Sequence, residues 1–433
     1  MSATRSEITD DIRSWLRARR TELHTAVGDA VAIRSFPGTV AQNAVQDLVQ
    51  EIAGTVTGSA VDRWRPDWAA VERLRAPVDA QQLWTPLIER DADYADVLPE
   101  LECLAIRHGD TEGAHLILNG HVDVVPADGQ PWSTEPFTPV ERDGWLHGRG
   151  SMDMKGGLIA AAFAYRYLAG HWSWPGKVSL CSVVEEESGG NGTLACLQRG
   201  HCGDAVVFTE PTDLRVIHRH VGIQAFSVTI TGRAGGMLRR SWADGVIPPL
   251  GRVLTALTEL EHRRTATAHA EGGYDPDDLP GFVNVGFVSS GEWLATRPGS
   301  ATMRGLMGVL PGETQQQAAQ AITTAIEEAV GDDEAKVDVV IPPGGHRGAE
   351  LPVGDELVDS FRWSQGVNAP GAPSRAGTMV CDAKIVHGGG WAPAIVLGPR
   401  GEGLHSADER VELASIEECV IRLVTGTASW FSR

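Results

Sequence analysis

Hydrophobic and polar positions along the chain follow two different periods, which predict both helices and strands. Apolar residues at helical spacing predict helices over residues 8–31, 40–54 and 156–168. Uninterrupted apolar runs that are too short for helices predict buried strands over residues 115–118, 178–184 and 205–208. Residues 61–100 are rich in Trp, Pro and Asp and have no clear period, so we expect this segment to be irregular.

Polar residues follow directly after each of the three predicted strands. The first strand ends in Asn119-Gly120-His121, the second in Glu185-Glu186-Glu187 and the third in Thr209-Glu210-Pro211. In open parallel α/β sheets, ligands bind at the carboxyl ends of the strands. The three strand ends are therefore expected to meet at one site.

The middle of the chain predicts a different arrangement. Its elements follow the order strand, helix, strand, strand, helix, strand, over residues 223–232, 245–262, 281–289, 301–309, 312–330 and 337–341. This is the order of a ferredoxin-like unit. Further elements are expected over residues 354–366, 395–397 and 414–426. We therefore predict an α/β domain in two parts, residues 1–217 and 343–433, with an α+β insert over residues 218–342.

Composition and charge exclude several classes of protein. The 433 residues include 37 basic and 57 acidic side chains, a formal charge of −20. This charge excludes a nucleic-acid binder and a protein bound to an anionic membrane surface. The first 20 residues are polar, and no apolar run reaches about 18 residues. We expect a cytoplasmic protein whose six cysteines, none in a C-x-x-C pair, are reduced and buried.

The acidic and imidazole groups near the strand ends indicate a metal site. Carboxylates crowded into one cleft repel one another and are driven toward protonation unless a cation neutralises them. A mixture of imidazoles and carboxylates suits Zn²⁺ or a similar divalent ion. Each group alone is common on protein surfaces, and their co-occurrence after apolar strands is what carries the prediction. The candidates are His121, Asp123, Asp153, Glu186, Glu187, Glu210 and His405.

Five segments resemble the motifs of one zinc-dependent metallopeptidase family, which includes acetylornithine deacetylase, succinyl-diaminopimelate desuccinylase, aminoacylase and carboxypeptidase G. They occur in the family's order, at residues 118–126 (LNGHVDVVP), 148–157 (GRGSMDMKGG), 185–193 (EEESGGNGT), 209–212 (TEPT) and 403–411 (GLHSADERV). The resemblance implies a mixed-sheet, zinc-exopeptidase-like catalytic domain with an inserted ferredoxin-like lid or dimerisation domain. It also implies a homodimer formed through the insert.

The resemblance implies two zinc ions per chain, with Co²⁺ or Mn²⁺ as possible substitutes. His121 and Glu210 would bind one ion, Glu187 and His405 the other, and Asp153 would bridge the two. Asp123 would hydrogen-bond the His121 imidazole and fix its tautomer. Glu186 would be the general base. The implied reaction is hydrolysis of the amide bond of a small N-acyl amino acid or peptide-like substrate by a metal-bound hydroxide.

The insert departs from the family pattern. The family's lid histidine, which steadies the oxyanion, aligns with Gly236, and the asparagine of the next family segment is missing at residues 245–248 (GVIP). Lys384 stands where relatives often have arginine.

Three explanations of these departures stay open. In the first, the protein is an amidohydrolase with a different lid, in which His218, His220 or Arg239 replaces the missing donor. In the second, it is a repurposed metalloenzyme of a specialised biosynthetic pathway that acts on an atypical substrate or forms or transfers a C–N bond. In the third, it binds metal with little catalysis, which the retained Glu186 argues against. For the enzyme, we expect substrate contacts from His218, His220, Arg239 and Lys384.

Overall fold

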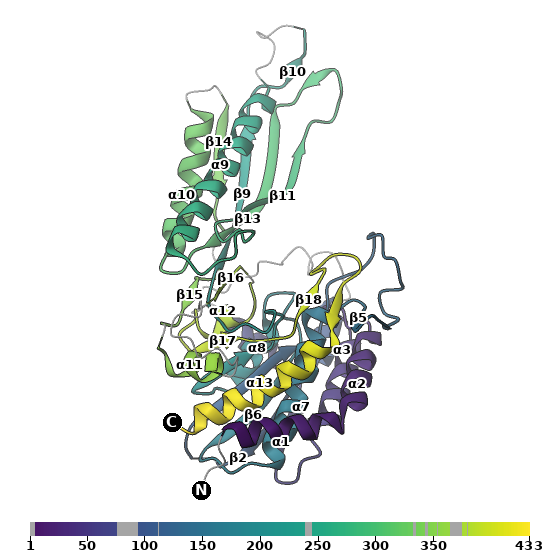
Figure 1. Cartoon of the computed structure of the whole chain (residues 1–433). Coiled ribbons are helices and arrows are strands. Elements are labelled where there is room, and N and C mark those ends of the chain that lie inside the picture. The colour runs from purple at the N-terminus through teal and green to yellow at the C-terminus, as the bar shows by residue number, and fades with distance from the viewer. Residues whose placement is uncertain are drawn as a thin grey trace.

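The computed structural model describes residues 5–75, 94–110, 112–238, 245–331, 335–342, 345–352, 354–363, 375–378 and 380–433. Two sheets with separate hydrophobic cores dominate the structure (Figure 1). The larger sheet belongs to a mixed α/β part, and the smaller sheet forms an elongated insert above it. The prediction of a mixed α/β fold with an α+β insert is confirmed.

The large sheet has the strand order β1-β2-β6-β3-β7-β17-β8-β15, with β16 also paired to β8. The strands are β1 (Ala60–Trp64), β2 (Cys103–Gly109), β3 (His115–His121), β6 (Lys177–Val183), β7 (Ala205–Phe208), β8 (Ile217–His220), β15 (Ala349–Glu350), β16 (Arg375–Gly377) and β17 (Ala394–Val396). The central strands β6, β3, β7 and β17 are parallel, and the β1–β2, β2–β6 and β15–β8 pairs are antiparallel.

Strand register brings the predicted polar residues to one edge. His121 on β3 pairs with Val183 on β6, and Asn119 pairs with Phe208 on β7. The residues after β6 and β7 therefore leave the sheet beside the end of β3. Every residue of β3 and β7 is buried, which explains the uninterrupted apolar runs at residues 116–118 and 205–208.

Helices cover both faces of the large sheet. The principal ones are α1 (Arg5–Arg17), α2 (Arg20–Ala32), α3 (Ala41–Ala53), α7 (Gly156–Gly170), α8 (Asn191–Arg199), α11 (Glu356–Trp363) and α13 (Leu413–Phe431). Shorter helical segments are α4 (Trp68–Arg75), α6 (Tyr94–Val97), η2 (Leu98–Glu100), η3 (Ser151–Lys155) and α12 (Ala383–Val386). Helix α7 is buried along almost its whole length and packs against α3, α13, β3 and β6.

Two predictions about this part are wrong. The single helix expected over residues 8–31 is broken between α1 and α2, where Arg19 N donates to the Leu16 carbonyl and leaves helical geometry. Residues 61–100 are not irregular throughout, because they contribute β1 and α4. Strand β1 lies at the edge of the sheet and buries only Trp64 fully, so it carries little periodic signal.

The small sheet has the antiparallel order β11-β13-β9-β14. Its strands are β9 (Gly222–Thr231), β11 (Val283–Ser290), β13 (Ser300–Val309) and β14 (Lys336–Val340), and the helices α9 (Ile247–Glu271) and α10 (Gln315–Val330) pack with it around one core. Thr314 and Gln317 form a capping box at the start of α10. Strand β8 belongs to the large sheet, so the small sheet begins at Gly222. The domain bounds at residues 217/218 and 342/343 stay predictions.

The described residues also form two minor sheets, apart from the large and the small sheet. Strands β10 (Gly235–Gly236) and β12 (Thr296–Arg297) pair at the end of the insert that points away from the α/β part (Figure 1). Strands β4 (Val140–Arg142), β5 (Trp145–His147), β18 (Gly401–Glu402) and β19 (Arg410–Glu412) form an antiparallel sheet in the order β18-β19-β5-β4.

All six cysteines are free thiols, and Cys202 is exposed, contrary to the prediction that all are buried. Among the described residues, no helix combines the length and hydrophobicity needed to span a bilayer.

Glycine at the start of α7 sets how closely this helix approaches β7. A Cβ atom at Gly157 would lie 1.8 Å from the carbonyl oxygen of Thr209, the residue before Glu210. A Cβ at Gly170, in the last turn of the same helix, would meet no atom within 4 Å. We predict that Gly157→Ala lowers the free energy of unfolding by about 1–3 kcal/mol. Urea unfolding measures this change, with Gly170→Ala as the matched control that stays at wild-type stability or above. Equal stability of the two variants would contradict the packing.

Candidate metal centre

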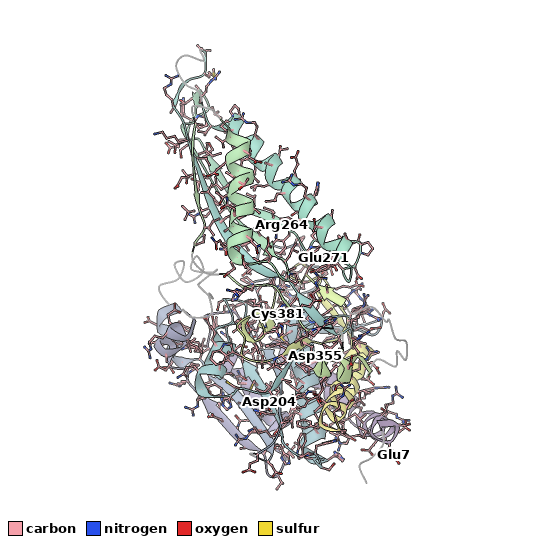
Figure 2. All side chains as sticks on the ribbon, turned by 90° about the vertical axis from the view of Figure 1, so that its left-hand side faces the viewer. Glu7, Asp204, Arg264, Glu271, Asp355 and Cys381 are labelled. Atoms are coloured by element: carbon pink, nitrogen blue, oxygen red, sulfur yellow. The ribbon has the colours of Figure 1, made fainter. Side chains whose placement is uncertain are left out.

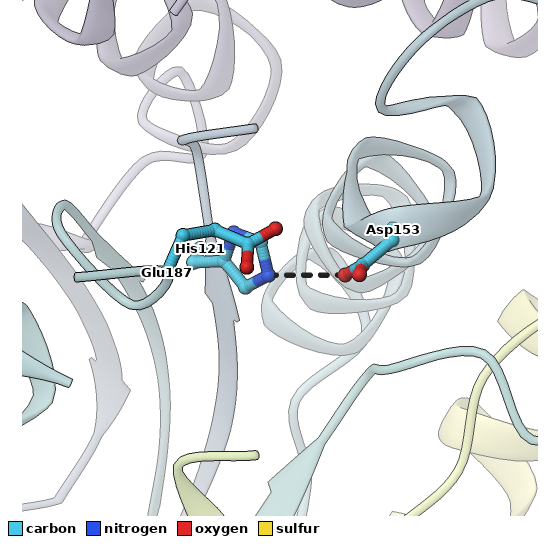
Figure 3. Close-up of side chains that lie close together, drawn as sticks. All are labelled: His121, Asp153 and Glu187. Atoms are coloured by element: carbon cyan, nitrogen blue, oxygen red, sulfur yellow. Dashed lines mark hydrogen bonds and ion pairs between the residues drawn. The ribbon is translucent and has the colours of Figure 1, made fainter. Parts of the chain in front are cut away.

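Five chain segments bring the predicted metal ligands together at the carboxyl edge of the large sheet. His121 is the last residue of β3, Asp153 lies in the turn η3 before α7, and His405 lies in the loop between β18 and β19. Glu187 and Glu210 follow β6 and β7. One ligand atom from each of His121, Asp153 and Glu187 lies within 4.8 Å of the others (Figure 3).

The Asp153 carboxylate lies between two groups of donors. Its Oδ1 is 3.2 Å from His121 Nε2, and its Oδ2 is 3.0 Å from His405 Nε2. Glu210 Oε1 lies 3.7 Å from the same nitrogen of His121, and Glu187 Oε1 lies 3.4 Å from that of His405. Each oxygen of Asp153 therefore faces one imidazole–carboxylate pair.

Burial and mutual repulsion raise the pKa values of the glutamates in this cluster. Burial and the nearby charge of Asp153 raise the pKa of Glu187 to about 8. Burial, again with a contribution from Asp153, raises the pKa of Glu210 well above its usual range. Hydrogen bonds to Asp153 and Glu187 raise the pKa of His405 to about 10. The carboxylates ionise together only with positive charge among them, and two imidazoles with three carboxylates are donors that suit divalent cations.

The orientation of His121 is fixed by its second ring nitrogen. Nδ1 donates to the carbonyl oxygen of Asp123 at 2.9 Å, which leaves Nε2 as the unprotonated nitrogen that faces Asp153 when the ring is neutral. The Asp123 carboxylate lies farther from Nδ1, at 3.5 Å. The predicted contact with the imidazole is therefore made mainly by the Asp123 main chain.

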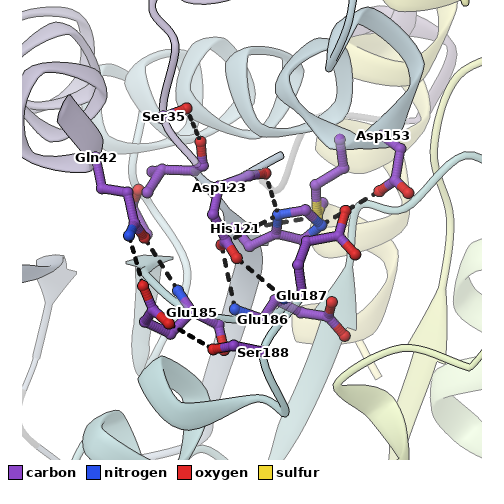
Figure 4. A network of polar contacts seen from close by, with 12 residues as sticks. Ser35, Gln42, His121, Asp123, Asp153, Glu185, Glu186, Glu187 and Ser188 are labelled. Carbon is purple, nitrogen blue, oxygen red and sulfur yellow. Dashed lines mark hydrogen bonds and ion pairs between the residues drawn. The ribbon is translucent and has the colours of Figure 1, made fainter. Parts of the chain in front are cut away.

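The carboxylate of Asp123 instead holds the loop after β6. Its two oxygens accept the backbone N–H groups of Glu186 and Glu187, at 3.1 and 3.0 Å (Figure 4). Asp123 is completely buried. One side chain thus sets the direction in which both the predicted base and a predicted ligand leave the backbone.

Glu185 anchors the same loop from the other side, a role that the sequence analysis missed. It adopts the left-handed backbone region with φ = 61°, and its Oε1 accepts from Gly38 N at 2.7 Å and from Gln42 Nε2 at 2.6 Å. Ser188 Oγ donates to its other oxygen (Figure 4). The first glutamate of the run is therefore structural and lies in the interior, which leaves the next two glutamates for the site.

Glu186 and Lys384 form a buried pair next to the predicted ligands. Lys384 Nζ lies 3.5 Å from Glu186 Oε1, and both side chains are less than a tenth exposed. Although burial opposes it, the charges of Glu186 and Asp382 raise the pKa of Lys384, so the ammonium group stays protonated. Lys384 thus contacts the predicted base directly.

An open cavity of about 330 Å³ adjoins these groups. Asp153, Glu186, Glu187, Glu210 and His405 form its polar wall, and the other described residues that line it are Thr378, Val380, Cys381 and Leu404. Cys381 lies where the α/β part meets the insert (Figure 2). These four residues were not predicted to belong to the site, although Leu404 lies within the motif segment 403–411.

Comparison with known proteins decides the family. Residues 117–425 match the sequence profile of Peptidase family M20/M25/M40. This segment contains every predicted ligand. The chain belongs to this family.

Two relatives and one solved structure show the range of the family around this member. The chain is 27% identical over 346 residues to N-formyl-4-amino-5-aminomethyl-2-methylpyrimidine deformylase of Bacillus subtilis (strain 168), covering 73% of this chain and 80% of that protein. It is 29% identical over 329 residues to succinyl-diaminopimelate desuccinylase of Bradyrhizobium sp. (strain BTAi1 / ATCC BAA-1182), with 71% and 80% covered. A dinuclear metal-binding M20 peptidase from Bacillus subtilis has a similar fold, with a TM-score of 0.60, 12% identity, and 95% and 99% of the chains covered. As a member of this family, the chain is a metal-dependent hydrolase of amide bonds.

The residues that were expected to contact substrate in this M20 member do not gather at one place, as the predicted ligands do. His218 and His220 lie on β8 with buried side chains, and His218 Nδ1 lies 2.6 Å from the Leu351 carbonyl oxygen. Neither is among the described residues that line the cavity. Arg239 lies outside the described residues. Gly236 lies on β10, at the far end of the insert (Figure 1). Of the three expected contacts that the structure describes, Lys384 reaches the site through Glu186.

Proposed function

We propose that the protein is a dinuclear zinc amidohydrolase that removes a small acyl group from an amine. The observation that carries the proposal is the placement of Asp153, which has one carboxylate oxygen 3.2 Å from His121 Nε2 and the other 3.0 Å from His405 Nε2. A carboxylate between two imidazole–carboxylate pairs suits two cations that share one ligand. The dinuclear site named for the Bacillus subtilis M20 peptidase of similar fold is consistent with this reading.

In this proposal, His121 and Glu210 would hold one ion, His405 and Glu187 would hold the other, and Asp153 would be shared between them. When bound, the ions acidify a water molecule and polarise the amide carbonyl. Zinc is proposed because imidazole and carboxylate donors suit it, and Co²⁺ or Mn²⁺ would suit the same donors. A cytoplasmic location remains part of the proposal.

Glu186 supplies the proton transfer. Its carboxylate lines the cavity beside the predicted ligands, and its backbone N–H is held by Asp123. We infer that Glu186 accepts the proton of the attacking water and passes it to the leaving amine nitrogen. Lys384, 3.5 Å away, fixes the carboxylate on the cavity wall and supplies a positive charge that would draw a substrate carboxylate.

The proposed substrate class is a small N-acyl amine or N-acyl amino acid. The two relatives are named for the removal of a formyl group and of a succinyl group. Apart from the polar cluster, the described residues that line the cavity are small or apolar, namely Thr378, Val380, Cys381 and Leu404. A short acyl chain would fit against such a wall. The alternative of C–N bond formation in a biosynthetic pathway has no separate feature in its favour among the described residues.

Metal removal and one substitution test the proposal together. We predict that chelation abolishes hydrolysis of a panel of N-formyl, N-acetyl and N-succinyl amines, and that Zn²⁺ or Co²⁺ restores it. Glu186→Gln should lower kcat by about 10²–10⁴-fold, because it removes the group that transfers the proton. Its zinc content, measured by mass spectrometry, should stay at two ions per chain.

Glu141→Gln is the matched control, since Glu141 is exposed on β4, away from the cavity lining. It should keep wild-type kcat. A Glu186→Gln variant with full activity and full metal content would exclude Glu186 as the base. Activity that survives complete chelation would exclude the metal mechanism.

We further propose that the protein forms a homodimer through the insert. Strand β11 is an edge strand of the small sheet, where Phe287 and Val288 are about half exposed. Trp293 and Leu294, in the loop after it, are 74% and 103% exposed. An apolar edge of this kind tends to pair with another chain, and a second copy offers the same edge.

Light scattering should therefore give twice the 46.3 kDa chain mass. Phe287→Asp should lower the measured mass toward that of one chain, because a charge at the apolar edge opposes pairing. Val340→Asp is the matched control, since Val340 is 50% exposed on β14, at the opposite edge of the same sheet. A wild-type mass of one chain would contradict the dimer.

A further inference from the structure

Two five-residue segments lie side by side at the proposed metal site. One carries the proposed bridging aspartate, and the other carries the most exposed of the proposed ligands. Residues 149–153 run from Arg149 to Asp153, and residues 405–409 run from His405 to Glu409. At one end, Asp153 Oδ2 and His405 Nε2 lie 3.0 Å apart. At the other end, Arg149 Nη1 donates to Glu409 Oε2 at 2.6 Å. The two segments are therefore tied together at both ends.

The Arg149–Glu409 ion pair is buried and contacts the main chain of the proposed bridging aspartate. Arg149 and Glu409 are 1% and 0% exposed. Glu409 Oε1 accepts the backbone N–H groups of Met152 and Asp153, at 2.9 and 3.1 Å. Glu409 thus holds the main chain from which the Asp153 carboxylate projects.

Gln130 extends this connection to His405. Its Oε1 accepts from Arg149 Nη2 at 3.0 Å, and its Nε2 donates to the His405 carbonyl oxygen at 3.0 Å. The contacts form a continuous path from the main chain of one ligand, through Glu409, Arg149 and Gln130, to the main chain of another. None of these three side chains belongs to the proposed ligand set.

His405 needs such support more than the other proposed ligands do. Its φ is 55°, a backbone conformation that residues with a side chain rarely adopt, and its side chain is half exposed. By contrast, the His121 side chain is 2% exposed and lies at the end of a central strand. The position of His405 therefore depends on contacts to its own loop.

We propose that Gln130 is a positioning residue that, together with Arg149 and Glu409, sets the place of His405 relative to Asp153 and so the affinity of the ion that His405 holds. The inference rests on the proposed dinuclear function. Side chains behind a metal ligand typically change metal affinity or activity by about 10–100-fold when they are removed.

Two substitutions at Gln130 separate its two contacts. Gln130→Ala removes both. Gln130→Glu keeps an acceptor for Arg149 but has no N–H to donate to the His405 carbonyl. Ser133 stays in place in both variants, and its N–H and hydroxyl both donate to Asp408 at 2.8 Å. The two loops therefore remain joined when Gln130 is changed.

The experiment is a titration of the metal-free, full-length chain with Zn²⁺ by calorimetry, and with Co²⁺ by absorption spectroscopy. Wild type should bind two ions. Both Gln130 variants should weaken one of the two binding events by about tenfold and change the spectrum of one Co²⁺, while the other event keeps its wild-type affinity. Asp128→Ala, an exposed change in the same loop, is the matched control and should leave both events unchanged.

Three results would overturn the inference. If Gln130→Glu binds both ions like wild type, the contact to the His405 carbonyl has no positioning role. If both binding events weaken equally and the melting temperature falls, Gln130 supports the fold rather than His405. If wild type binds fewer than two ions, the proposed function fails and this inference fails with it. If wild type binds two ions and the Gln130 variants bind them with the same affinities, this inference alone fails.

Discussion

The concentration of buried negative charge at the edge of the large sheet is the constraint on which the rest of the structure depends. Asp153, Glu187 and Glu210 lie close enough that burial and the Asp153 charge raise the pKa of both glutamates. Such a cluster is costly unless cations balance it, and it must be held rigidly for the cations to bind. The surrounding structure provides this rigidity through main-chain contacts. Asp123 holds the Glu186–Glu187 loop, Glu185 anchors it from behind, and Glu409 holds the main chain of Asp153.

The parallel arrangement of β6, β3 and β7 explains why the proposed ligands meet. Parallel neighbours end at the same edge, so residues far apart in sequence leave the sheet side by side. Gly157 lets α7 lie close to Thr209, which keeps the turn that carries Asp153 next to the strand end that carries Glu210. His405 comes from outside the sheet and depends on its loop contacts. The site thus combines a sheet edge with one proposed ligand from a loop.

The central strands, the site at their ends and the order of the insert could be predicted, because each leaves a local pattern of apolar and polar residues in the sequence. Apolar runs that end in His121, Glu187 and Glu210 predicted both the central strands and the site at their ends. The ferredoxin-like order of the insert could be predicted for the same reason. Strand β1 and the break between α1 and α2 could not, because an edge strand buries little and a helix break of two residues leaves the apolar period almost unchanged.

Contacts between distant residues were beyond the sequence pattern. Arg149 and Glu409 are 260 residues apart, and Gln42 and Glu185 are 143 apart. The role of Asp123 also depends on tertiary structure, because its carboxylate faces the loop after β6 while its carbonyl group contacts the imidazole. The expected contacts of His218 and His220 with substrate came from the need to replace the missing lid donor, and the sequence did not show that both residues lie on strand β8. Strand β8 pairs within the large sheet, and both side chains are buried.

The most direct test of a dinuclear centre bridged by Asp153 is anomalous X-ray scattering at the zinc edge from crystals of the zinc-loaded protein. A centre of this kind predicts two peaks, one on the His121 and Glu210 side of the Asp153 carboxylate and one on the His405 and Glu187 side, about 3.5–4 Å apart. A single peak, or two peaks of which one makes no contact with Asp153, would contradict it.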